Sequence, residues 1–350
     1  SRGEAALCEK IQKTLKTLGI DSEEDQTGAR IGGDAGNLYA FINGTLDLPP
    51  LLLSAHMDSV DPAFGKKAMV HPDGTITSDG STVLGADDLS GVAVILEALT
   101  VLWENKIPHR PLEVLFDVSE ETYCTGIQQF DFSRIRSKEA YVFDLSGPVG
   151  CAAYQAPSIL SFRAVFRGRA AHAAFSPEEG IHAIKAAADA LSLIPCGHVG
   201  DTTVNLGTIC GGTADNIVPE TCTVTGEVRS FDDESAKRQL RAIETSMRAA
   251  AAKTGVTLDF YTEALCTAYQ VNREERIARR FHSACVDTGL EPKFVVTYGG
   301  SDNNHFAQQG ISGLVVASGM NNCHSRQEWT SVSELEKAAE LTLALILAKE

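Results

Sequence analysis

The sequence lacks the features that mark membrane, disulfide-bonded and nucleic-acid-binding proteins. No apolar run approaches transmembrane length, and the opening residues SRGEAALCEK do not resemble a signal peptide. The nine cysteines are odd in number and scattered, without a Cys-x-x-Cys pair, which is typical of reduced thiols in the cytosol. The net charge of -16 disfavours nucleic acid and anionic membrane as partners. We therefore expect a cytoplasmic protein that binds neither nucleic acid nor a membrane.

The composition is that of a folded protein with a sizeable core. Hydrophobic residues make up 43% of the 350 residues and charged residues 22%, which excludes a disordered class. The length exceeds that of a typical single domain, so two domains are expected. With 46 acidic residues in the chain, no single Asp or Glu indicates a site by itself.

Apolar segments of strand length alternate with helical segments in the first and last parts of the chain. Helical spacing of apolar residues predicts helices over 4–18 and 88–104, another after Arg273, and a last one from Ser333. Strands are predicted near 37–42, 51–55, 112–119, 140–146, 294–300 and 313–319. This alternation predicts an α/β fold with a doubly wound, mostly parallel sheet.

The middle of the chain has a different rhythm. A strand over 159–167 is followed by a helix over 178–194, strands near 203–209 and 221–230, a helix over 233–252 and a strand over 256–264. This β-α-β-β-α-β order is the ferredoxin-like arrangement. We therefore predict a sheet domain of residues 1–155 and 267–350 that is interrupted by a smaller α+β domain of residues 156–266.

Histidines and carboxylates follow the predicted strands of the larger domain. These residues are His56 and Asp58, Glu120 and Glu121, Asp144, and His324, and a Gly-flanked loop before a helix adds Asp87 and Asp88. In an open α/β sheet, sites form outside the carboxyl ends of the strands, and nitrogen and oxygen ligands suit zinc. Each acidic pair alone is better explained as a solvated loop end, and His56 alone as a histidine near the core. Their convergence on one edge predicts a metal site.

The spacing within two of these pairs suggests separate roles. His56-x-Asp58 places both side chains on one face of a strand, so Asp58 can orient His56 as a ligating histidine requires. The neighbours Glu120 and Glu121 point in different directions, so one can bind metal while the other reaches a water on that metal.

Motifs along the whole chain resemble one enzyme family. In order, they are SAHMDSVDP, DGTITSDGSTVLGADD, SEE, VFDLSGP, GRAAHA, GGTADNIVPE, RSFD, GGSDNNHF and GMNNCHS. The sequence resembles the peptidase T-like members of the metallopeptidase group that includes acetylornithine deacetylase, aminoacylase and carboxypeptidase G. The resemblance implies a catalytic domain with two zinc ions and a lid domain that mediates homodimer contacts.

The resemblance also implies individual roles. Five residues bind two zinc ions, with His56 and Asp144 on the first, Glu121 and His324 on the second, and Asp87 on both. Glu120 is implied as the general base and Asp58 as the residue that orients His56. Mn²⁺ or Co²⁺ can occupy the same nitrogen and oxygen shell.

Three residues of the lid are implied to act on the substrate. By the resemblance, His172 stabilises the developing oxyanion, with the option that a dimer partner supplies it, and Asn216 and Arg229 bind the substrate. Arg229 would clamp a terminal carboxylate through two hydrogen bonds. The alternatives stay open, because Arg229 lies on a polar strand face and Asn216 suits a turn.

The sequence departs from the family pattern at Leu89, where many relatives carry a lysine, and the EETYCTG segment is also unusual. The favoured hypothesis is an aminopeptidase for short peptides, in particular a tripeptidase. An N-acyl amino acid deacylase or a carboxypeptidase on the same scaffold is the alternative. A catalytically inactive binding paralogue is a lesser one, since all the implied ligands and the base are present.

Overall fold

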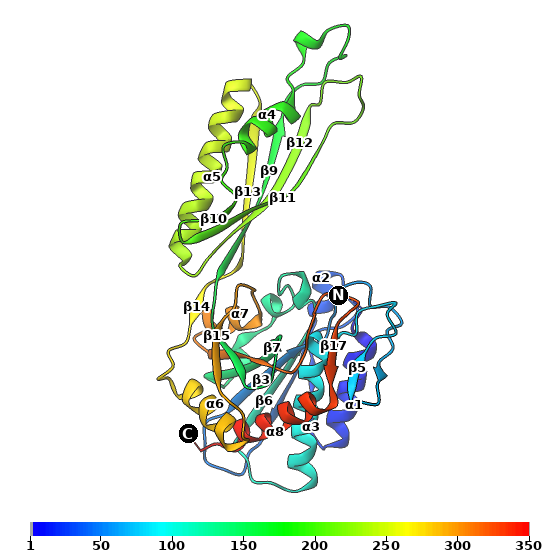
Figure 1. The fold of residues 1–350 in the computed structure, drawn as a ribbon, viewed down its shortest axis with the longest axis vertical. Coiled ribbons are helices and arrows are strands. Elements are labelled where there is room, and N and C mark those ends of the chain that lie inside the picture. Colours follow the sequence, from blue (N-terminus) through cyan, green and yellow to red (C-terminus); the bar gives the residue numbers. More distant parts are fainter. Residues whose placement is uncertain (1–2, 350) are drawn as a thin grey trace. The chain divides into compact units, whose positions relative to one another are not determined.

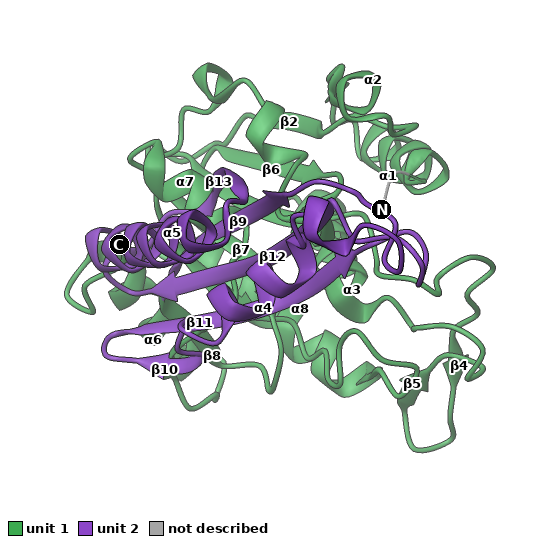
Figure 2. Ribbon diagram, turned by 90° about the horizontal axis from the view of Figure 1, so that it is seen from above, with its two compact units in different colours: residues 1–155, 270–350 green, residues 156–269 purple. Residues whose placement is uncertain are grey.

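The computed structural model describes residues 3–349 of the chain. The chain divides into two compact units, with Ser1–Gln155 and Gln270–Glu350 in unit 1 and Ala156–Tyr269 in unit 2. Figure 2 colours the two units separately. Within the described range, every helix is too short or too polar to cross a bilayer.

Unit 1 is built on one large mixed sheet. Its strands follow the order β1-β2-β6-β3-β7-β16-β8, with β15 also pairing with β8. The bounds are β1 Glu23–Glu24, β2 Leu38–Ile42, β3 Leu51–His56, β6 Leu112–Asp117, β7 Glu139–Leu145, β8 Cys151–Ala156, β15 Lys293–Val296 and β16 Ser312–Ala317. The short β14 (Tyr269–Gln270) lies at the boundary of the units. The strand expected over 294–300 ends at Val296, before the Gly299-Gly300 pair.

The four central strands of this sheet are parallel. β3 pairs in parallel with β6 on one side and β7 on the other, and β16 pairs in parallel with β7. All six residues of β3 and of β6 are buried, which explains why these segments are almost continuously apolar. The mostly parallel sheet is thus confirmed. The carboxyl ends of its central strands meet at one edge.

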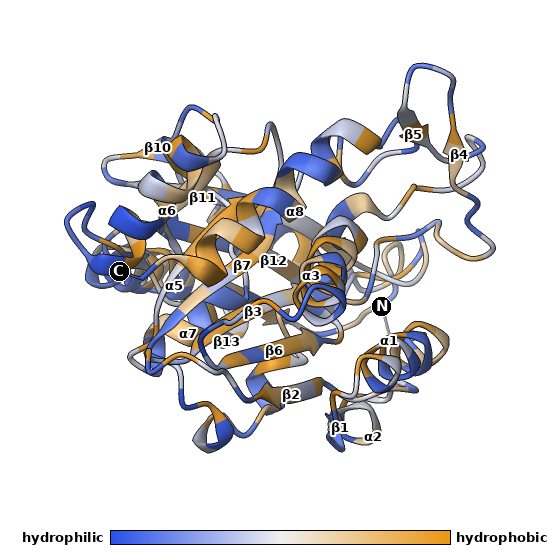
Figure 3. Ribbon diagram, turned by 90° about the horizontal axis from the view of Figure 1, so that it is seen from below, coloured by the Kyte–Doolittle hydropathy of each residue, from blue (hydrophilic) through white to orange (hydrophobic). Residues whose placement is uncertain are grey.

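Helices pack around the parallel strands. Their bounds are α1 Ala5–Thr17, α2 Thr27–Ile31, α3 Ala86–Glu104, α6 Arg276–Asp287, α7 Asp302–Gln308 and α8 Val332–Leu347. α3 contacts β3 and β7, α8 lies on α3, α6 on α8, and α7 on β16. In Figure 3 the strands β3, β6 and β7 are largely orange, whereas α1 carries both colours. Apolar side chains therefore concentrate where helices and sheet meet.

Smaller elements complete unit 1. β17 (Trp329–Ser331), β5 (Thr75–Thr77) and β4 (Met69–Val70) form a three-stranded sheet in that order. Short 3-10 turns occur at η1 Glu120–Thr122, η2 Ile127–Gln129 and η3 Phe132–Arg134. The turn η1 lies just beyond the end of β6, so it holds its two carboxylates at the edge where the parallel strands end.

Unit 2 is an antiparallel sheet with two helices. Its elements are β9 Ser158–Arg167, η4 Pro177–Glu179, α4 Ala183–Leu191, β10 Gly197–Val199, β11 Thr202–Gly211, β12 Thr221–Ser230, α5 Asp233–Thr254 and β13 Thr257–Cys266. The strand order is β10-β11-β12-β9-β13. Without the short β10, this is the predicted ferredoxin-like arrangement (Figure 1).

The first helix of unit 2 is shorter than expected. A helix was expected over 178–194, but α4 covers only Ala183–Leu191. Residues Pro177–Glu179 form a separate 3-10 turn, and His182 caps α4 by accepting the N–H of Lys185. The proline and the capping histidine therefore set the start of the helix, and the apolar spacing alone did not reveal them.

Candidate active site

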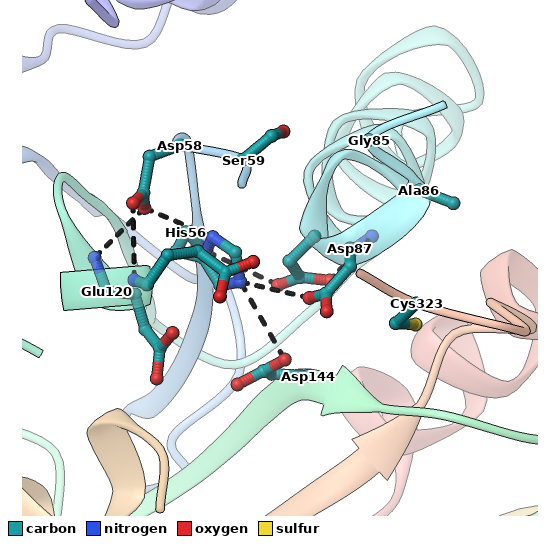
Figure 4. Close-up of polar contacts among 12 residues, drawn as sticks. His56, Asp58, Ser59, Gly85, Ala86, Asp87, Glu120, Asp144 and Cys323 are labelled. Atoms are coloured by element: carbon teal, nitrogen blue, oxygen red, sulfur yellow. Dashed lines mark hydrogen bonds and ion pairs between the residues drawn. The ribbon is translucent and has the colours of Figure 1, made fainter. Parts of the chain in front are cut away.

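The predicted site residues of unit 1 gather at the carboxyl edge of the parallel strands. His56 ends β3, Glu120 and Glu121 form η1 after β6, and Asp144 lies near the end of β7. His324 follows β16, and Asp87 lies at the start of α3. Figure 4 shows His56 at the centre, with Asp58 on one side and Asp87 and Asp144 on the other. The topology therefore brings together side chains that are far apart in sequence.

The buried His56 imidazole contacts carboxylates through both ring nitrogens. Its Nε2 lies 3.2 Å from Asp87 Oδ1 and 3.8 Å from Asp144 Oδ1. Its Nδ1 lies 3.3 Å from Asp58 Oδ1. A histidine that ligates a metal through one nitrogen commonly donates from the other to a carboxylate. His56 therefore faces Asp87 and Asp144 with Nε2 and Asp58 with Nδ1.

Asp87 lies between the two histidines of the cluster. Its Oδ1 faces His56, whereas its Oδ2 lies 3.1 Å from His324 Nε2. The same His324 nitrogen lies 2.9 Å from Glu121 Oε2. One carboxylate with an oxygen toward each of two histidine groups has the arrangement of a bridging ligand. The contacts thus separate into two sets that share Asp87.

Asp58 also holds the segment that carries the two glutamates. Its carboxylate accepts the backbone N–H of Glu120 at 2.9 Å and that of Glu121 at 3.2 Å. The Glu120 carboxylate turns to a different partner, since the Cys124 thiol donates to its Oε1 at 3.2 Å. Asp58 therefore positions His56 and both glutamates, and the two glutamates face different groups.

Left-handed backbone conformations cluster around these residues. Ser119, Tyr123, Cys124 and His324 all have φ between 56° and 63°. Such conformations are costly for residues other than glycine, and they are retained where the surrounding contacts enforce them. This strain is concentrated in the segments that present Glu120, Glu121 and His324, as expected of a functional site.

The charges of the cluster shift its pKa values strongly. Hydrogen bonds to Asp87 and Glu121 raise the pKa of His324 to about 10. Burial lowers the pKa of His56, but hydrogen bonds to Asp144, Asp58 and Asp87 outweigh it and hold that pKa well above the usual value. Burial raises the pKa of Asp144 to about 7. Without a metal, two protonated histidines thus supply the positive charge that the carboxylates require.

The donor set fits divalent metal ions. The ligand atoms of His56, Asp87 and Glu121 lie within 4.8 Å of one another, and so do those of His56, Glu120 and Asp144. The buried Glu121 Oε1 has no hydrogen-bond partner among the described residues. Imidazole nitrogen with carboxylate oxygen suits Zn²⁺, Mn²⁺ or Co²⁺. The residues can therefore hold a metal pair.

Two further carboxylates support this cluster, and only one of them, Asp88, was singled out from the sequence. The buried Glu328 accepts the backbone N–H of Gly85 at 2.7 Å and that of Asp87 at 2.9 Å. The buried Asp88 accepts the N–H of His56 at 3.3 Å. Glu328 lies 243 residues from Gly85 in the chain, and no local pattern marks it. For Asp88, its place in the GADD motif was the available signal.

The predicted residues of unit 2 lie in two separate places. His172 and Asn216 are exposed neighbours, because Ala173 N–H donates to the Asn216 carbonyl oxygen and His172 pairs with Ile217. Arg229 lies near the far end of β12, which begins at Thr221, so roughly 26 Å of extended strand separates it from that first residue. Within unit 2, therefore, the structure groups His172 with Asn216 but not with Arg229.

Arg229 has a partner within its own strand. Its Nε and Nη2 donate to the two carboxylate oxygens of Glu227 at 2.8 and 3.1 Å. Both side chains are about one quarter exposed, at 28% and 26%. The guanidinium is thus neither fully solvated nor fully buried, and Glu227 holds its orientation.

Two family models match separate parts of the chain. The peptidase dimerisation domain matches residues 154–255, which lie almost entirely within unit 2. The model of peptidase family M28 matches residues 37–147, which carry most of the cluster in unit 1.

Individual relatives match over nearly the whole length. The uncharacterized protein YqjE of Bacillus subtilis is 33% identical over 347 residues, covering 99% of this chain and 93% of the relative. The structure of aminopeptidase PepT from Bacillus cereus is 35% identical with a TM-score of 0.89, covering 98% of this chain and 92% of that one. A tripeptidase structure from Staphylococcus aureus is 31% identical with a TM-score of 0.92 and the same coverage. These similarities include both units.

Proposed function

Because the chain belongs to the peptidase T-like M20 metallopeptidases and is therefore a peptidase, we propose that it is a two-metal aminopeptidase for short peptides, in particular tripeptides. The observation that carries the metal part is Asp87, which turns one carboxylate oxygen to His56 and the other to His324. The substrate part is supported by the aminopeptidase and the tripeptidase among the similar structures.

In the proposed centre, His56 and Asp144 would hold one ion, Glu121 and His324 would hold the other, and Asp87 would serve both. Two divalent cations at such a site polarise the scissile carbonyl and lower the pKa of a water toward ~7. We expect zinc, with manganese or cobalt as substitutes. The histidines must be neutral to ligate, so binding the ions displaces the protons that the cluster otherwise retains.

Glu120 is the proposed general base. Its carboxylate takes the proton of the attacking water and passes it to the leaving amine. Burial raises the pKa of Glu120 well above its usual value, and the negative charge of Asp144 adds to the rise. A carboxylate in such surroundings is stabilised when it accepts a proton or when cations lie close to it. Asp58 holds the backbone of Glu120 by accepting its N–H, and it holds the ring of His56 through the contact with Nδ1 of that ring.

Unit 2 is proposed as the lid and dimerisation domain. The match of residues 154–255 to the peptidase dimerisation domain supports a homodimer formed through it. We propose that His172 stabilises the oxyanion and that Asn216 and Arg229 bind the substrate. Because His172 and Asn216 lie apart from Arg229 within the unit, a dimer in which one protomer's pair serves its partner would account for the separation. A cytoplasmic location stays a prediction, supported by nine cysteines that form no disulfide within the described residues.

Product analysis by mass spectrometry tests the proposal. The panel holds free dipeptides, free tripeptides, N-acetyl-blocked tripeptides and N-acyl amino acids, each with Zn²⁺ or Mn²⁺. We expect release of the N-terminal residue from free tripeptides, with blocked tripeptides left intact. Cleavage confined to acylated substrates would replace the aminopeptidase by a deacylase, and release of C-terminal residues would replace it by a carboxypeptidase.

A further inference from the structure

A lysine reaches the support of the candidate metal centre from an otherwise exposed loop. Lys66 lies in the segment between β3 and β4, where the neighbouring Phe64 is fully exposed and Lys67 is exposed as well. Lys66 itself is half-buried. The segment is fastened to the chain before α3 because Val83 N–H donates to the Pro62 carbonyl oxygen at 2.9 Å. This places Lys66 close to the loop that carries Asp87.

The Lys66 ammonium lies between two parts of the centre. Its Nζ donates to Ser59 Oγ at 2.9 Å, next to Asp58. On the other side it lies against Gly85, where an added Cβ would stand 2.3 Å from Nζ and 2.8 Å from Ser59 Oγ. Gly85, at φ +76°, thus leaves room for the ammonium. Lys66 joins the end of β3 to the start of the Asp87 loop.

The charges at this point explain why a cation is needed. Asp58 and Glu328 are almost completely buried, at 2% and 1% exposed. Burial lowers the pKa of Lys66, whereas the negative charges of Glu328 and Asp58 raise it. Buried carboxylates are costly without an opposite charge. One ammonium here offsets both carboxylates that hold the backbone of the site.

We propose that Lys66 is a positioning residue of the metal centre. Its ammonium holds Asp58, which orients His56 and the glutamates, against the Gly85–Asp87 loop, which Glu328 fixes. Without this charge, the buried carboxylates of Asp58 and Glu328 would repel each other. The repulsion would move the ligands that Asp58 positions away from the loop that carries Asp87. The inference rests on the proposed metal function and adds to it a residue that touches neither metal nor substrate.

The same geometry includes Leu89, which directly follows the Asp87-Asp88 pair. Leu89, Lys66, Ser59 and Met57 line one hollow of about 460 Å³. A lysine at position 89 would open onto this hollow too. In this chain, then, a lysine from a different segment supplies the positive charge on that side of the centre.

The test compares Lys66→Met with Lys67→Met, a matched change at the exposed neighbour. Zinc binding to the chelator-treated full-length chain is measured by calorimetry with a competing chelator, and kcat and KM are measured on a tripeptide. Lys66→Met should weaken the binding of at least one zinc ion by about 10–100-fold and lower kcat by a similar factor. KM should stay within about twofold of the value for the parent chain. Lys67→Met should behave as the parent chain. Adding Leu89→Lys to Lys66→Met should recover part of the affinity, because charge is what the hollow requires.

Unchanged zinc affinity in Lys66→Met would overturn the inference. So would a drop in the melting temperature of the metal-free chain with affinity and kcat intact, because that result would make Lys66 a purely structural residue. The affinity measurement needs no turnover, so failure of the parent chain to cleave peptides would contradict the proposed function alone.

Discussion

The predicted residues of unit 1 and those of unit 2 are held in very different ways. In unit 1 the side chains of His56, Asp87 and Asp144 are at most 13% exposed. The carboxylates of Asp58 and Glu328 hold the neighbouring backbone by accepting the N–H groups of Glu120 and Gly85. In unit 2, His172 and Asn216 are exposed on loops, and Arg229 donates to the carboxylate of Glu227. The first group is mostly buried and held by several polar contacts, whereas the second is more exposed.

This difference matches what each group is proposed to do. A metal pair demands ligand positions fixed within fractions of an ångström, which four parallel strands and buried carboxylates supply. Substrate groups vary between peptides, which suits residues on exposed loops and a partly exposed arginine. Changes in unit 1 should therefore abolish chemistry or metal binding, while changes in unit 2 should weaken substrate use.

The largest effect is expected for Glu120→Gln. Losing the proposed base should lower kcat by about 10³–10⁴-fold, at the upper end of general acid–base effects, while the carbonyl oxygen of Gln still accepts from Cys124. Metal content, measured by mass spectrometry of the elements, should match the parent chain. Glu104→Gln on the exposed end of α3 is the control. Loss of metal from Glu120→Gln would instead make Glu120 a ligand.

A smaller effect is expected for Glu328→Gln. The amide replaces one acceptor by a donor, so the N–H of Gly85 or of Asp87 loses its partner. Metal affinity should fall by about 10–100-fold, as for other residues that orient ligands. Titration with zinc against a competing chelator measures it. Equal affinity would show that the Asp87 loop keeps its position without Glu328, which would weaken the contrast between the units.

Arg229→Ala tests the other side of the comparison. Because Arg229 is half-buried and already paired with Glu227, we expect a loss of about 1.5–2 kcal/mol in kcat/KM, roughly ten- to thirtyfold, mainly through KM. Metal content should not change. Arg163→Ala, an exposed arginine on the neighbouring β9, is the matched control. An unchanged kcat/KM would leave Arg229 as a structural partner of Glu227.

The smallest expected effect is a change with pH in the stability of the metal-free chain. The pKa of His324 is raised from 6.5 to about 10, so the stability that its protonated form contributes is present below about pH 6.5 and lost as the pH rises through about 10. The melting temperature of the metal-free chain should therefore fall between pH 7 and pH 10. His324→Ala should show less of this fall. The same fall in both chains would contradict the assigned contacts of His324.

The sequence predicted the parallel strands and the residues at their ends because both leave local patterns. The apolar run before His56 and the run before Glu120 each indicate a buried strand, and the polar residues that follow indicate an edge. The supports of the site have no such signal. Glu328 reaches Gly85 across 243 residues of the chain, and Lys66 comes from a loop without periodicity, so only the folded arrangement reveals them.

The boundaries of the elements show the same limit. The helix expected over 178–194 was too long because Pro177 and the capping His182 act through backbone geometry rather than through hydropathy. Similarly, the roles of His172, Asn216 and Arg229 came from resemblance alone. The bounds of β12 match the strand expected near 221–230, but the pairing of His172 with Ile217 across unit 2 has no local signal in the sequence.

The most direct test of the two-metal account is the metal content of the parent chain and of His324→Ala, measured together with tripeptide hydrolysis. The account predicts two ions per parent chain with release of the N-terminal residue, and about one ion with little hydrolysis in His324→Ala. One tightly held ion in the parent chain without hydrolysis, or two ions retained in His324→Ala, would contradict it.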